Sequence, residues 1–140
     1  MVNQSTAPYA ALILRLMLGV MFIAHALLKV LVFTVPGTVQ FFESVGFPGF
    51  FAHVTIAAEL GAGVLLIAGV ATRWVALATV PILLGAAWVH LPNGWVFSAQ
   101  GGGWEYPVFL AIAAFVQFLL GDGAYALSPR PAPLTASRAA

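Results

Sequence analysis

Residues 10–32 form an apolar run that is long enough to cross a membrane, yet it contains three ionisable side chains. About 20 apolar residues, rising 1.5 Å each, span the ~30 Å hydrocarbon core of a bilayer. At about 100° per residue, Arg15, His25 and Lys29 lie within about a third of the helix circumference. Lipid penalises a charge at mid-depth by roughly 2.5–3.5 kcal/mol. This face must therefore point towards other helices that carry matching polar groups.

The composition indicates an integral membrane protein. Of the 140 residues, 62% are hydrophobic and 6% are charged, whereas soluble domains have about 25% charged residues. We expect one membrane domain over residues 1–127 and a Pro-rich, disordered cytoplasmic tail over residues 128–140. The net charge of +1 argues against nucleic acid as a partner. The absence of cysteine excludes disulfides, thiol catalysis and iron–sulfur clusters carried by this chain.

Glycine and proline residues divide the apolar sequence into four spans. The segment between the first two spans is too short and too polar to cross the bilayer, which favours an interfacial or re-entrant helix. In the second span, Ala57 and Gly61 form a small-xxx-small pair that would let a neighbouring helix approach closely. The sequence thus predicts an all-α bundle of four transmembrane helices, over about residues 10–32, 50–70, 74–91 and 104–120.

The arginines lie on one side of the four predicted spans. Arg15, Arg73, Arg130 and Arg138 fall near the ends that carry both termini, and the loops on the other side contain no Lys or Arg. The positive-inside rule then places both termini in the cytoplasm. We therefore predict a multi-pass protein of a bacterial-type cytoplasmic (inner) membrane.

Ionisable side chains from all four predicted helices fall in the outer half of the bilayer. From the helical rise, His25 lies about 10 Å deep and Glu59 roughly 13 Å deep. Both side chains are too short to reach water easily, so we interpret Glu59 and His25 as an interacting catalytic pair that contacts a head group and exchanges protons. The residues predicted to complete the ligand site are Lys29, His53, Trp88, His90, Trp104, Glu105 and Tyr106.

Each of these residues also has a structural interpretation. Long polar side chains reach the interface, and tryptophans commonly anchor helices at membrane boundaries. A pair between Glu59 and either His25 or Lys29 would fix the register of two helices without any chemistry. Near the inner face, Arg15 and Asp122 are candidates for a second structural pair.

Haem and metal ions fit the sequence poorly. Haem b needs two facing histidines, but the depths of His25 and His90 differ by about 8 Å. A metal site that combines histidines with Glu59 or Glu105 has no supporting spacing motif. We expect no covalently bound cofactor, no haem and no metal ion.

A series of motifs covers about residues 12–127 in order: Arg15-x3-Gly19-x5-His25-x3-Lys29, Gly46-Phe47-Pro48, Glu59 with Gly61, Gly69-x2-Thr72-Arg73, Gly102-Gly103-Trp104-Glu105-Tyr106 and Gly121-x-Gly123. In these motifs the chain resembles the DoxX family of small four-helix membrane proteins. It departs from the family at Ala26, where glycine is frequent, and at Ser128, where an acidic residue is common. The resemblance implies an association with redox, detoxification or oxidative-stress systems. Relatives include the membrane subunit of an archaeal thiosulfate:quinone oxidoreductase.

Three functions are compatible with the sequence. The favoured hypothesis is a redox-associated membrane subunit that binds a quinone-like molecule and receives electrons from a partner protein, because no redox centre is evident in the chain. Whether the chain is itself an enzyme stays open. The alternatives are a non-catalytic anchor or assembly subunit, and a small proton-coupled transporter, which would require a homo-oligomer.

Overall fold

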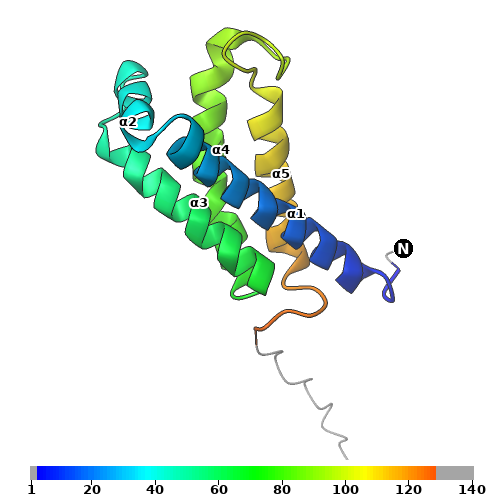
Figure 1. The fold of residues 1–140 in the computed structure, drawn as a ribbon. Helices are drawn as coiled ribbons and strands as arrows, with labels where there is room; N and C mark the ends of the chain where they lie inside the picture. Colours follow the sequence, from blue (N-terminus) through cyan, green and yellow to red (C-terminus); the bar gives the residue numbers. More distant parts are fainter. Residues whose placement is uncertain (1–2, 129–140) are drawn as a thin grey trace, which may run out of the picture.

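The computed structural model describes residues 3–128, and every regular element in that range is helical (Figure 1). The all-α prediction is therefore confirmed for these residues. The long helices are α1 (Ala7–Leu27), α3 (Phe50–Ala68), α4 (Thr72–His90) and α5 (Glu105–Leu120), and a shorter helix is α2 (Val35–Ser44). A π-helical turn, η1 (Leu28–Val32), extends α1, and a 3-10 turn, η2 (Leu91–Asn93), follows α4.

Three helical segments are long and apolar enough to cross a membrane. They are Ala7–Val32 with 26 residues, Phe50–Ala68 with 19 and Thr72–Asn93 with 22. They coincide with the first three predicted spans and support a multi-pass membrane protein. Helix α5 is apolar but has 16 residues, which corresponds to about 24 Å. Helix α2 has 10 residues, or about 15 Å, which is half the hydrocarbon core.

Helix α1 packs mainly against α3, and α4 packs mainly against α5 (Figure 1). The first pair is closest where Gly19 faces Gly63, because a methyl group on Gly63 would lie 2.8 Å from the Gly19 carbonyl oxygen. The prediction that Ala57 and Gly61 make the close approach is wrong. A methyl group on Gly61 would meet no atom within 4 Å, since both residues lie on the exposed face of α3.

Buried apolar side chains fill the middle of the bundle. In α1, Leu18 and Phe22 lie between Arg15 and His25, so apolar packing separates the two ends of that polar face. We call this group the apolar layer. Its other buried members are Leu66, Ala76, Leu83, Ala111 and Ala114.

The two ends of the bundle differ. Helix α2 and the α4–α5 loop lie at one end, and the N-terminus and the segment after α5 lie at the other (Figure 1). We call these the α2 end and the Arg15 end. At the Arg15 end, the Ser128 hydroxyl accepts a hydrogen bond from the Ala71 backbone N–H at 2.9 Å. The rest of the predicted tail, residues 129–140, lies outside the described residues.

Candidate functional site

An ion pair joins the first two long helices at the α2 end. The Lys29 ammonium donates to both carboxylate oxygens of Glu59, each at 2.8 Å. The Lys29 side chain is 18% exposed and the Glu59 side chain 8%. Burial of both charges would be costly without this pairing. Glu59 of α3 is therefore the polar partner that the inward-facing side of the first span requires.

His25 lies one turn before Lys29 and contacts a different helix. Its Nδ1 atom is 2.8 Å from the Met21 carbonyl oxygen. Because a carbonyl can only accept, Nδ1 must carry the proton, and Nε2 of a neutral ring is then an acceptor. The imidazole stacks on the Tyr106 ring, with centroids 6.0 Å apart and planes 24° apart.

The expected contact between His25 and Glu59 is not formed in the structure. Both carboxylate oxygens of Glu59 accept hydrogen bonds from Lys29. The longer side chain of Lys29 reaches α3 from η1, one turn beyond His25. The His25 ring is turned towards Tyr106 of α5 instead. The Lys29 Nζ atom also lies 3.5 Å from the backbone carbonyl oxygen of His25, a contact that does not involve the imidazole.

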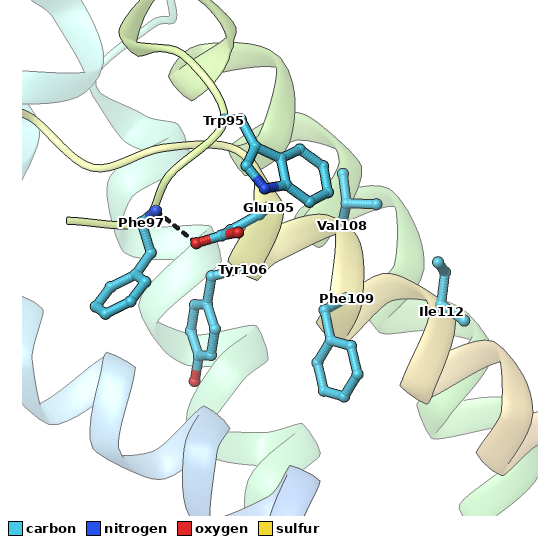
Figure 2. Close-up of a pocket in the computed structure, with 7 residues that line it drawn as sticks. All are labelled: Trp95, Phe97, Glu105, Tyr106, Val108, Phe109 and Ile112. Carbon is cyan, nitrogen blue, oxygen red and sulfur yellow. Dashed lines mark hydrogen bonds between the residues drawn. The ribbon is translucent and has the colours of Figure 1, made fainter. Parts of the chain in front are cut away.

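An aromatic groove lies along the start of α5 and beneath the α4–α5 loop (Figure 2). Its volume is about 370 Å³. Glu105 fixes the loop over the groove, because its Oε1 atom accepts a hydrogen bond from the Phe97 backbone N–H at 2.8 Å. Tyr106 belongs both to the groove and to the stack with His25. The complete lining consists of Trp95, Phe97, Glu105, Tyr106, Val108, Phe109 and Ile112.

Five lining residues were not among those predicted from the sequence: Trp95, Phe97, Val108, Phe109 and Ile112. A signal for the helical ones does exist. Together with Glu105, the residues at 108, 109 and 112 follow the spacing of one helix face. Phe97 lies in an irregular loop, where no periodicity reveals which side chains gather.

The remaining predicted ligand residues are dispersed. His53 is exposed on α3, and Trp88 packs edge-on against Phe47 with centroids 5.8 Å apart. His90 lies 3.5 Å from the Asn93 side-chain nitrogen. Trp104 packs edge-on against Trp95, with centroids 4.4 Å apart, beside the groove. The structure thus brings together His25, Lys29, Glu59 and Tyr106, and it leaves His53 and Trp88 outside this cluster.

Arg15 is held by the backbone at the opposite end. Its side chain is buried, with the residue 1% exposed. One terminal nitrogen donates to the carbonyls of Leu66 at 3.1 Å and Ile67 at 2.9 Å, and the other donates to Ala124 at 3.0 Å. The last carbonyls of a helix lack amide partners and carry its negative dipole end, so they suit a guanidinium.

The predicted ion pair between Arg15 and Asp122 is not formed. Asp122 accepts a hydrogen bond from the Thr72 backbone N–H at 3.1 Å and so caps the start of α4. Gly69 ends α3 with φ of 72°, and this turn directs the α3 carbonyls towards Arg15. The two terminal nitrogens of the guanidinium are therefore bonded to carbonyl oxygens and not to the carboxylate, and the buried Nε atom has no hydrogen-bond partner among the described residues.

Within residues 3–128, no three His, Asp or Glu side chains gather closely enough to hold a metal. His25 and His90 have separate partners, Tyr106 and Asn93. The site instead offers an ion pair, an imidazole and a phenol beside an aromatic groove.

These features define a small, multi-pass, α-helical membrane protein with a polar cluster at one end. The DoxX family model matches residues 10–91, and the chain belongs to the DoxX family. It is also 44% identical over 75 residues to the "putative oxidoreductase CatD" of Bacillus subtilis (strain 168). That match covers 54% of each protein, so the chain spans about half the length of this curated relative. No solved structure matches the chain.

Proposed function

We propose that the protein is a redox-associated membrane subunit that binds a quinone-like ring in the aromatic groove at the α2 end. In this proposal α5 is the fourth transmembrane span, and α2 is an interfacial or re-entrant helix. The α2 end faces outwards and both termini face the cytoplasm of a bacterial-type inner membrane. The name of the Bacillus subtilis relative, an oxidoreductase, supports the redox association.

The observation that carries the proposal is that Tyr106 contacts both the groove and His25. This one side chain lines the groove and stacks on His25, and Figure 2 shows its ring extending from α5 towards α1. A ring seated in the groove would have apolar neighbours on α5 and polar groups at its edge, which is the usual composition of a small-molecule site. The side chains of Phe97 and Phe109 are largely exposed, so a ligand could enter the groove between them from the lipid.

In this proposal the polar cluster of His25, Lys29, Glu59 and Tyr106 would transfer the protons that reduction of the quinone requires. Reduction of a quinone to a quinol consumes two electrons and two protons. The electrons would come from a partner protein. The Tyr106 hydroxyl would donate a hydrogen bond to the head group, and His25 would exchange protons beside it. Lys29 would hold the Glu59 carboxylate in place, so that Glu59 serves as the second exchanging group.

Ligand binding tests this proposal directly. The protein in lipid nanodiscs is extracted for bound quinone and titrated with short-chain ubiquinone and menaquinone analogues. We expect Tyr106→Leu to weaken binding about tenfold or more, because it removes both the stack and the hydroxyl. Phe115→Leu is the matched control, since Phe115 is an exposed aromatic residue of the same helix outside the groove. A protein that neither retains quinone nor binds either analogue contradicts the proposal.

Single cysteines test the proposed orientation, because the chain contains none of its own. Ser98 in the α4–α5 loop and Ser5 before α1 are both exposed. We expect an impermeant thiol reagent to label Ser98→Cys but not Ser5→Cys on intact cells. The reverse pattern would move the polar cluster to the cytoplasmic side.

One observation favours a second candidate function, the non-catalytic anchor. Both Glu59 oxygens are engaged by Lys29, as in an ion pair that only fixes helix register. Under this alternative, loss of Glu59 would lower stability and leave ligand content unchanged.

A further inference from the structure

The helical turn that carries Lys29 is irregular. In η1 the Phe33 backbone N–H donates to the Leu28 carbonyl at 3.0 Å. In an α-helix the same N–H would donate to Lys29, four residues earlier. The π-helical turn therefore deprives the Lys29 carbonyl of its usual amide partner, and a buried carbonyl without a partner is costly.

Thr38 of α2 replaces the missing partner. Its hydroxyl lies 3.0 Å from the Lys29 carbonyl oxygen and 2.9 Å from the Thr34 carbonyl oxygen, so it bridges the two elements. Thr38 is 3% exposed and is the buried residue of α2. The contact thus lies where α2 meets the end of the first span.

The connection between η1 and α2 is also under strain. Thr34 has φ of 63° and ψ of 156°, a region in which a β-branched residue is rare. Such a conformation persists only where the surroundings hold it. Thr34 accepts a hydrogen bond from the Gly37 backbone N–H at 3.3 Å, and its carbonyl is one of the two acceptors near the Thr38 hydroxyl.

We propose that Thr38 is a positioning residue that holds η1 so that the Lys29 ammonium reaches both oxygens of Glu59. Lys29 is the second residue of this five-residue turn, so the Thr38 hydroxyl contacts the backbone of the same residue whose side chain forms the ion pair. The Thr38 hydroxyl stabilises that altered turn from α2. The docking of α2 and the Lys29–Glu59 pair are therefore coupled. The role of this coupling in turnover rests on the proposed function, but the coupling itself does not.

The chain contains a single lysine, which makes the pair measurable. An amine-reactive reagent can modify Lys29 and the N-terminal amine, and peptide mass spectrometry separates the two products. Modification of Lys29 requires the ammonium to leave Glu59, so its rate reports opening of the pair. Uniform 15N-lysine labelling also gives one side-chain ammonium signal by NMR.

Thr38→Val removes the hydroxyl at nearly constant volume, and Thr38→Ser is the matched variant that keeps it. In nanodiscs we expect the Val variant to raise the modification rate of Lys29 about fivefold, the effect of losing one hydrogen bond. Its ammonium signal should shift as well. The Ser variant should restore both readouts to within about twofold of the parent.

The proposal is overturned if Lys29 of the Val variant is modified at the parent rate. It is also overturned if Lys29 of the Ser variant is modified as fast as Lys29 of the Val variant. Should the Val variant aggregate, Thr38→Ala replaces it against Thr38→Ser under the same criteria. None of these readouts uses a quinone. Failure of the quinone titration therefore leaves this result intact, and a normal Thr38→Val rate rejects the coupling without affecting the binding proposal.

Discussion

The two cationic residues that face inwards from the first span are satisfied in opposite ways. Arg15 donates to three backbone carbonyls, which the fold holds in place. Lys29 pairs with one carboxylate, a partner whose charge a proton can remove. Arg15 is nearly inaccessible at 1% exposure, whereas the Lys29 side chain is 18% exposed. The cation at the Arg15 end is thus held by backbone atoms, whereas the cation at the α2 end, where the proposed function places the ligand site, depends on a single side chain.

Arg15→Leu should have the largest effect on stability. Three carbonyls would lose a charged donor in a buried place, and hydrogen bonds to charged groups contribute about 1.5–3 kcal/mol each. We expect a loss of at least about 3 kcal/mol, or failure to accumulate in the membrane. Thermal unfolding of the detergent-solubilised protein measures this. Arg73→Leu is the control, because Arg73 is exposed, and it should cost less than about 1 kcal/mol. Equal losses of unfolding free energy in Arg15→Leu and Arg73→Leu would show that the buried arginine is no more important for stability than the exposed one.

Gly69→Ala should have the next largest effect. Its positive φ disfavours any side chain, and the added methyl would collide with the Arg15 guanidinium and with Ala126. We expect a loss of about 2 kcal/mol in unfolding free energy. Gly61→Ala is the matched control on the same helix, because nothing lies within 4 Å of its methyl position. That variant should be neutral or slightly stabilising. A stable Gly69→Ala protein would show that the fit around Arg15 is loose.

Glu59→Gln should have the smallest effect on stability and the largest on function. The amide keeps the shape and one acceptor but removes the charge opposite Lys29, so we expect a loss of about 1 kcal/mol. Quinone binding or the cellular phenotype should nevertheless be lost if the α2 end is the functional site. Glu59→Leu provides the contrast, since it leaves the Lys29 charge without a partner and should be less stable than the Gln variant. If both variants keep ligand content and phenotype and differ only in stability, the α2 end is as structural as the Arg15 end.

The sequence predicted the helix ranges well, because long apolar runs bounded by glycine and proline leave few alternatives. It also indicated that the polar face of α1 must meet polar groups, and Glu59 is such a group. It offered both His25 and Lys29 as partners of Glu59 and could not decide between them, because that choice depends on the rotation of α1 against α3 at Gly19 and Gly63. The partners of Arg15 could not be predicted from the sequence for another reason. Every residue has a carbonyl, so a backbone acceptor leaves no mark in the sequence. The π-helical turn is likewise a pattern of hydrogen bonds and not of residue types.

The apolar layer has a consequence for how the protein would respond to the membrane potential. Leu18, Phe22 and Leu66 separate the Lys29–Glu59 pair from the Arg15 end. Under the proposed function, a proton that reaches Glu59 would enter from the α2 end and would not cross the apolar layer. A full crossing of the membrane changes the energy of a unit charge by about 2.3 kcal/mol per 100 mV, and such a proton senses only a fraction of that voltage. Under the proposed function, proton exchange at this site would therefore depend on the pH at the α2 end and on only part of the voltage across the membrane.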